Sequence, residues 1–146
     1  MSTSVRHTGI VVDDLSLWIT FLTKNFDFYI WVEQLEKGEF ISNLLGIADC
    51  EVQTVKLRDS KEGAIELLHF QSPANHREFS DSVAPNSFGI THIALEVKFL
   101  DSKIETLSEQ GFFPISPVKL SADGKARVCY LRGPEQVLFE LVELVA

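Results

Sequence analysis

The chain has 146 residues and a mass of 16.4 kDa, which is enough for one domain with a substantial core. Its 21 Asp and Glu outnumber its 13 Lys and Arg and leave a net charge of −8. That charge argues against a nucleic-acid or anionic-membrane partner, because both favour a basic patch. The apolar runs are too short for a transmembrane helix, and the first residues lack an apolar signal core, so we expect a cytoplasmic protein. Cys50 and Cys129 form no C-x-x-C pair and are expected to be reduced and packed.

An internal repeat with a constant offset of 85 residues divides the chain. It aligns segment 7–15, which begins with His7, with segment 92–100, which begins with His92. The triplet Ile-Glu-Leu at 65–67 later matches Phe-Glu-Leu at 139–141. The repeat predicts two modules within one domain, residues 1–72 and 88–146. The segment 73–87 between them is rich in turn-forming residues and is expected to be a linker.

Each module is expected to have the order β-α-β-β-β, which makes the fold class α+β. The predicted strands are 5–12, 28–34, 51–58 and 64–70 in the first module, and 90–97, 112–119, 126–132 and 137–144 in the second. An extra piece at 40–48 of the first module is expected to form a short helix. The sheets of the two modules are expected to build one cup-shaped site.

An apolar stripe marks one helix in each module. In the first module it runs from Leu15 to Phe26, and either Asp13 or Asp14 is expected to cap the helix. In the second module the stripe begins at Leu100, residues 102 and 105 have the spacing of a capping box, and Gly111 is expected to stop the helix.

Four side chains within apolar strands are candidates for a metal site. Strand alternation places His7 and His92 on the face away from the helix of each module, and does the same for Glu66 and Glu140. A carboxylate on such a strand is costly unless it is paired or binds a cation. Two imidazoles and two carboxylates suit Zn²⁺, Ni²⁺, Co²⁺, Mn²⁺ or Fe²⁺ and leave two octahedral positions for water or substrate.

This arrangement resembles the vicinal oxygen chelate superfamily. The superfamily includes glyoxalase I, methylmalonyl-CoA epimerase, extradiol dioxygenases, and the bleomycin and fosfomycin resistance proteins. The resemblance covers nearly the whole chain and is strongest in segments 90–97 and 138–144. It implies that the two histidines and the two glutamates hold one divalent ion. The usual Asp-Pro-Asp-Gly turn is replaced here by Arg-Gly-Pro-Glu-Gln at 132–136, and no glutathione- or CoA-binding set is identifiable.

The function expected from this resemblance is that of a metal-dependent lyase or isomerase of the glyoxalase or epimerase type. Glu140 is the leading candidate for the base that removes an α-proton, with Glu66 as its counterpart. Glu96 and Cys129 are assigned to the substrate pocket. The partner is a small molecule, and a homodimer is expected because exposed sheet edges pair in this family.

Two other functions stay open. The first is an Fe²⁺ ring-cleavage dioxygenase that uses His7, His92 and Glu140, although a fourth ligand at Glu66 would block a position that O₂ needs. The second is a non-catalytic drug-binding protein, which would not need four metal ligands. Outside these sets, Glu143 is expected to be solvated. His69 and His76 are expected to be structural or exposed, and His76 lies in the linker.

Overall fold

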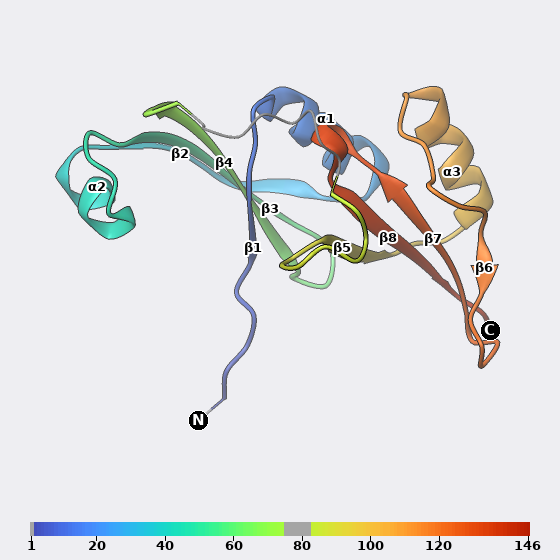
Figure 1. Cartoon of the computed structure of the whole chain (residues 1–146). Helices are drawn as coiled ribbons and strands as arrows, with labels where there is room; N and C mark the ends of the chain where they lie inside the picture. The colour runs from blue at the N-terminus through green and yellow to red at the C-terminus, as the bar shows by residue number, and fades with distance from the viewer. Residues whose placement is uncertain (1, 75–82) are drawn as a thin grey trace. The chain divides into compact units, whose positions relative to one another are not determined.

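The computed structural model describes residues 2–74 and 83–146, and the chain divides into two compact units, Met1–Arg77 and Glu78–Ala146. Each unit contains a β-α-β-β-β module whose strands form a four-stranded mixed sheet (Figure 1). The predicted α+β class and the repeated module are confirmed. Much of the predicted linker 73–87, with His76, lies outside the described residues, and the module boundary stays a prediction.

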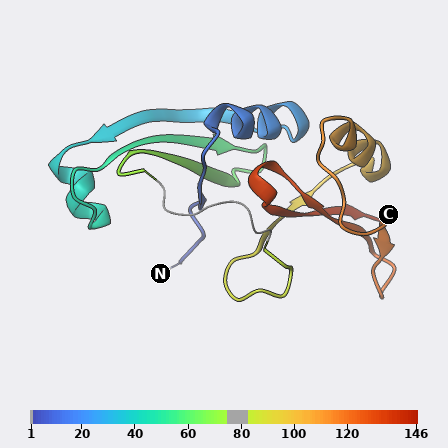
Figure 2. The same ribbon diagram turned by 45° about the horizontal axis from the view of Figure 1, so that its top comes forward.

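The first module consists of β1 (Thr8–Val11), α1 (Leu15–Asn25), β2 (Tyr29–Lys37), α2 (Glu39–Leu45), β3 (Glu51–Arg58) and β4 (Ala64–Ser72). Its strands are ordered β1-β4-β3-β2, and β1 is parallel to β4 while the other pairs are antiparallel. Figure 2 shows α1 and α2 on opposite sides of this sheet.

Helix α1 forms where the apolar stripe predicts it. Trp18 and Leu22 are completely buried against the sheet, and Phe21 joins them in the core. The side chain of Asp14 accepts a hydrogen bond of 3.0 Å from the backbone N–H of Leu17, and this bond selects Asp14 as the cap.

The extra piece of the first module is the short helix α2. Its Ile41 packs with the buried side chains of Cys50 and Val52, and Leu68 and Phe70 lie against the same cluster. This cluster fixes α2 to the outer part of the sheet, on the face that α1 leaves uncovered.

The second module consists of β5 (His92–Glu96), α3 (Leu100–Glu109), β6 (Lys119–Leu120), β7 (Ala126–Arg132), a 3₁₀ turn (Pro134–Gln136) and β8 (Leu138–Leu144), with strand order β5-β8-β7-β6. The strand expected at 112–119 is wrong for most of its length. Pro114 and Pro117 have no N–H to give to a ladder. Only an isolated bridge from Pro114 to Leu131 and the two-residue strand β6 form there.

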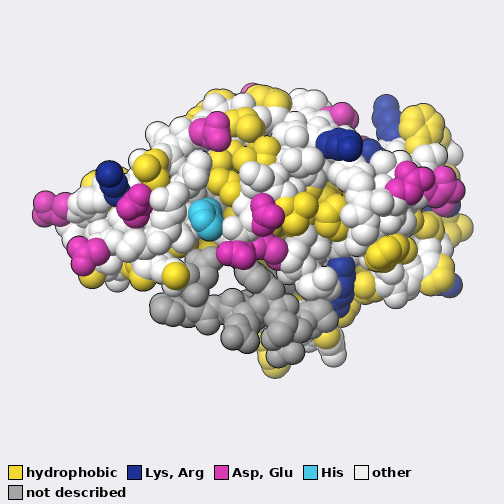
Figure 3. Space-filling model, turned by 90° about the horizontal axis from the view of Figure 1, so that it is seen from above, with side chains coloured by type: hydrophobic (Ala, Val, Ile, Leu, Met, Phe, Trp, Pro, Cys, Tyr) yellow, Lys and Arg dark blue, Asp and Glu magenta, His cyan; other side chains and the backbone are white. Residues whose placement is uncertain are grey.

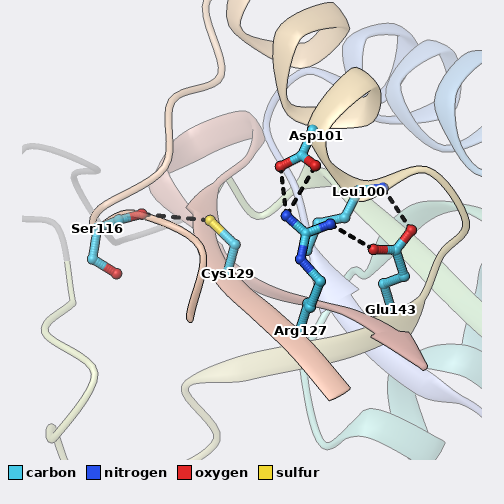
Figure 4. Close-up of polar contacts among 6 residues, drawn as sticks. All are labelled: Leu100, Asp101, Ser116, Arg127, Cys129 and Glu143. Atoms are coloured by element: carbon cyan, nitrogen blue, oxygen red, sulfur yellow. Dashed lines mark hydrogen bonds and ion pairs between the residues drawn. The ribbon is translucent and has the colours of Figure 1, made fainter. Parts of the chain in front are cut away.

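The capping box expected at Ser102 and Glu105 is also wrong. Helix α3 begins at Leu100, so Ser102 already lies inside its first turn, and no local side chain caps the helix. The backbone N–H of Leu100 instead donates a hydrogen bond of 3.1 Å to Oε1 of Glu143, which reaches it from β8 (Figure 4). Glu143 is therefore a capping residue, and the expectation that it is solvated is wrong.

An arginine of β7 completes this contact. Arg127 donates from Nη1 to Glu143 at 2.9 Å and from Nη2 to both carboxylate oxygens of Asp101 at 2.8 and 2.9 Å (Figure 4). The hydrogen bonds from Arg127 lower the pKa of Asp101 below its ordinary value. The guanidinium thus joins the first turn of α3 to two strands of its sheet.

The surface is mixed in character. Asp and Glu side chains are dispersed over the face drawn in Figure 3, among apolar side chains. Edge strand β2 exposes four large apolar side chains by 41–54%: Tyr29, Ile30, Trp31 and Leu35. No helix in the described part of the chain is long and apolar enough to span a membrane.

Candidate metal centre

Each module brings one histidine and one glutamate together, and the two modules use the same strand register. Gly9 pairs with Glu66 in the parallel β1–β4 ladder, and Ala94 pairs with Glu140 in the parallel β5–β8 ladder. Each histidine stands two residues before the small residue of its pair. Alternation therefore places it on the glutamate's face, away from the main helix of the module. The small partner residues leave room beside each carboxylate.

The second His–Glu pair has nearly the spacing of neighbouring metal ligands, and the first pair is wider. Nε2 of His7 lies 3.8 Å from Oε1 of Glu66, and Nε2 of His92 lies 3.2 Å from Oε2 of Glu140. Adjacent ligands with bonds of about 2.1 Å lie about 3.0 Å apart in an octahedral site. The four side chains are only 15–34% exposed, so they are fixed by the sheet while still reachable. In donor type each pair suits half of a four-ligand site, and the pair of the second module also comes close to it in spacing.

The structure brings the four predicted ligands together as pairs, one pair in each module. Among residues 2–74 and 83–146, no three His, Cys, Asp or Glu side chains are grouped in a way that would hold a metal. The joint site of His7, Glu66, His92 and Glu140 therefore stays a prediction.

The residue opposite each glutamate on the next strand differs between the modules. Lys56 of β3 pairs in register with Glu66, and its Nζ lies 3.6 Å from Oε2 of that glutamate. Tyr130 of β7 pairs in register with Glu140, and its hydroxyl lies 3.5 Å from Nε2 of His92. One carboxylate thus has a cation as its neighbour and the other has a phenol.

Tyr130 also fixes the ring of its histidine. The rings of Tyr130 and His92 meet edge to face with their centroids 5.1 Å apart. Burial, the negative charge of Glu140 and a hydrogen bond to that carboxylate all raise the pKa of Tyr130. The phenol therefore keeps its proton near neutral pH and serves as a hydrogen-bond donor.

The two residues assigned to the substrate pocket lie in different surroundings. Glu96 is exposed at the end of β5 and shares the face of His92 by alternation. Cys129 pairs in register with Leu141, on the opposite face from Glu140, and is 2% exposed. Its thiol donates weakly to the carbonyl of Ser116 at 3.5 Å (Figure 4), and burial raises its pKa.

His69 and the two cysteines are predicted to have structural roles. His69 lies off the glutamate face, and its Nδ1 is 3.1 Å from the carbonyl oxygen of Val12. This contact confirms its structural role. Cys50 and Cys129 are both unbridged and buried, as expected.

Sequence reasoning missed Lys56 and Tyr130. The signal was present, because each stands ten residues before the glutamate of its module. Without the hairpin register, however, that spacing does not say which residue faces the carboxylate.

A comparison with known protein families identifies the superfamily to which this fold belongs. The family model described as the glyoxalase/bleomycin resistance protein/dioxygenase superfamily matches residues 6–130. The chain belongs to this superfamily, which confirms the resemblance found in the sequence. No curated protein sequence matches the chain.

Solved structures share the fold at low sequence identity. A glyoxalase family protein from Bacillus cereus superposes with a TM-score of 0.91 at 21% identity, covering 100% of this chain and 97% of that one. A glyoxylase/bleomycin resistance protein/dioxygenase domain from Frankia sp. has a TM-score of 0.68 at 16% identity, with coverages of 99% and 94%. A mutant of the fosfomycin resistance protein FosX from Listeria monocytogenes, complexed with Mn(II) and 1S,2S-dihydroxypropylphosphonic acid, has a TM-score of 0.63 at 18% identity, with coverages of 97% and 90%.

Proposed function

We propose that this chain is a metal-dependent lyase or isomerase of the glyoxalase or epimerase type. The observation that carries the proposal is the repeated register that brings one histidine and one glutamate together in each module. FosX, a structural neighbour, is seen with Mn(II), which supports a divalent ion as the cofactor. The proposed ligands are His7, Glu66, His92 and Glu140.

The proposed substrate has two neighbouring oxygens and an acidic C–H bond between or beside them. An α-hydroxycarbonyl compound has this chemistry, as does a thioester flanked by a carboxylate. His7, Glu66, His92 and Glu140 would hold the divalent ion, which would supply Lewis acidity for the carbonyl of such a substrate.

The residues around the two glutamates have different roles in the proposed proton transfer. Glu140 accepts the α-proton and returns it to the same carbon or to its neighbour. Tyr130 keeps its phenolic proton and holds the His92 ring by an edge-to-face contact. Lys56 pairs with Glu66 and leaves that carboxylate less available as a base. The proposed base is therefore in the second module.

The first experiment measures the metal directly. Full-length protein purified without added metal is analysed by inductively coupled plasma mass spectrometry, and we expect about one divalent ion per chain. His7→Ala and His92→Ala should each lose the ion, whereas Glu109→Gln, which removes a carboxylate at the exposed end of α3, should keep it. Undiminished metal in both histidine variants would contradict the proposed site.

The second experiment tests the reaction. The metal-loaded protein is incubated in deuterated water with α-hydroxycarbonyl compounds and with thioesters flanked by a carboxylate. Proton NMR then follows the loss of the α-proton signal. We expect exchange with at least one compound and its loss in Glu140→Gln. Absence of exchange across both classes would reject the lyase or isomerase assignment.

A further inference from the structure

Two cationic residues follow one another on the face of β3 that carries the first module's His–Glu pair. Lys56 pairs in register with Glu66, and Arg58 pairs with Ala64, with no irregularity in the ladder between them. Residues two apart on a strand point to the same side, about 7 Å from each other. Lys56 and Arg58 therefore lie side by side on the site face of the sheet.

Lys56 has hydrogen-bonding capacity left over. Its side chain is 24% exposed and meets Glu66 through a single contact of 3.6 Å. An ammonium group carries three N–H donors, and one carboxylate oxygen at this distance uses at most one of them. The remaining donors are held near the site face by the sheet.

Arg58 is held in place and yet incompletely satisfied. Its guanidinium carbon lies 3.2 Å from the ring centroid of Trp31, which sits in the bulge of β2 between Ile30 and Val32. Within the described part of the chain, Nε of Arg58 is buried and has no hydrogen-bond partner. A buried donor without an acceptor is costly, and a negative charge close to the guanidinium would offset that cost.

The equivalent arginine of the second module donates hydrogen bonds to the backbone. Arg132 follows Tyr130 by two residues, as Arg58 follows Lys56. Its Nη1 and Nη2 donate hydrogen bonds of 3.1 Å to the backbone carbonyls of Gln136 and Val83. Backbone oxygens thus accept from two nitrogens of Arg132, whereas the Nε of Arg58 has no acceptor within the described residues.

We propose that Lys56 and Arg58 form a subsite for an oxyanion of the substrate, which is a carboxylate, phosphate or phosphonate group. The subsite rests on the proposed function, because it adds a negative charge to a substrate whose neighbouring oxygens face the metal ligands. The two cations exceed the single charge of Glu66, in a chain whose net charge is −8. An arginine fork recognises planar and tetrahedral oxyanions, and an ammonium adds a second point of attraction.

The test uses the full-length chain in EDTA, at low ionic strength and without chloride. Inorganic phosphate and acetate are titrated separately while calorimetry and amide NMR shifts report binding. We expect saturable binding that weakens about tenfold or more in Arg58→Gln and in Lys56→Gln, since each removes a charge-assisted hydrogen bond. Arg58→Lys keeps a positive charge but removes the guanidinium fork and its Nε, so it should recover only part of the affinity lost in Arg58→Gln. Lys125→Gln, which removes an equal charge from the exposed β6–β7 turn, should change it less than about twofold.

The outcomes separate the subsite from the proposed reaction. Preference for phosphate assigns a tetrahedral group, and preference for acetate assigns a carboxylate. Equal affinities in Arg58→Gln, Lys56→Gln and Lys125→Gln, or no saturable binding of either anion, would overturn the subsite. Because the titration contains no metal, proton exchange without anion binding rejects the subsite alone. Anion binding without proton exchange rejects the lyase or isomerase assignment alone.

Discussion

Tyr130 lies opposite Glu140 in the β7–β8 ladder. At the equivalent place in the β3–β4 ladder, Lys56 lies opposite Glu66. The repeat makes the two glutamates equivalent in position, while their cross-strand neighbours make them different in chemistry.

We therefore predict different outcomes for the same substitution in the two modules. Glu140→Gln should keep most of the metal and slow the reaction by about 10²–10⁴-fold, because a glutamine cannot accept the proton. Glu66→Gln should keep the metal and substantial activity. Metal content and deuterium exchange are measured on the same samples. Loss of exchange in Glu66→Gln alone would reverse the assignment, and exchange in both variants would make Glu96 the next candidate.

The residue that caps α3 lies on strand β8, so a substitution in the strand can remove the cap. Glu143→Ala takes away the acceptor for the N–H of Leu100 and also an acceptor of Arg127, so it should destabilise the protein by at least about 1 kcal/mol, the usual value of a helix cap alone. Urea unfolding at pH 7 measures the effect. Glu109→Ala, at the other end of the helix, removes a carboxylate without removing a cap and serves as the control. Equal losses in the two variants would contradict the capping role.

The ion pair of Asp101 and Arg127 should make stability depend on acid pH. Hydrogen bonds from Arg127 lower the pKa of folded Asp101 below its ordinary value of 3.8. The stabilisation is therefore complete above that value and is lost as the pH falls through the lower pKa of the folded state. Urea unfolding of the wild type and of Asp101→Asn should differ at pH 7 and converge in strong acid. A difference that persists unchanged at about pH 2 would contradict the assignment.

The turn before β8 offers a stabilising substitution. Gln136 has a φ of 65°, a left-handed conformation that glycine adopts without steric cost. Gln136→Gly should raise the free energy of unfolding by about 0.5–1 kcal/mol, since the relief of strain exceeds the added chain entropy. Only the backbone carbonyl of Gln136 receives Arg132, so that contact survives. Gln110→Gly, at a φ of −89°, should instead destabilise the protein, and thermal unfolding compares the two.

The exposed apolar side chains of β2 support the predicted homodimer. Edge strands with large apolar side chains are commonly paired or covered in stable proteins. Sedimentation velocity of the full chain should show a species of twice 16.4 kDa. Leu35→Lys, on the exposed part of β2, should shift it toward monomer, whereas Leu120→Lys, on the edge strand β6, is the matched control. A monomer at high concentration would remove the prediction.

Patterns local to one segment predicted most of the fold. The stripe that contains Trp18 and Leu22 gave α1 its position, and strand alternation placed His7 and Glu66 on one face. The errors arose where a distant residue or a missing donor decided the structure. Prolines shortened the strand expected at 112–119, and the cap of α3 came from Glu143.

In the candidate site, too, some residues were predictable from the sequence and others depend on distant strand pairing. Its histidines and glutamates follow from the repeat, whereas Lys56, Arg58 and Tyr130 are brought to it by hairpin register. Register depends on the pairing of two strands, and a shift of one residue would turn each of these side chains to the other face.

The distant cap of α3 also bears on the order in which the chain can acquire structure. Asp14 caps α1 from within its own segment, so the first helix has its cap as soon as it is synthesised. The backbone N–H of Leu100 has its acceptor on Glu143, which is 43 positions later in the chain. During synthesis from the amino end, helix α3 therefore gains its cap only after the strand that carries Glu140 has been made. The cap of α3 and the proposed base thus depend on the same strand, Leu138–Leu144.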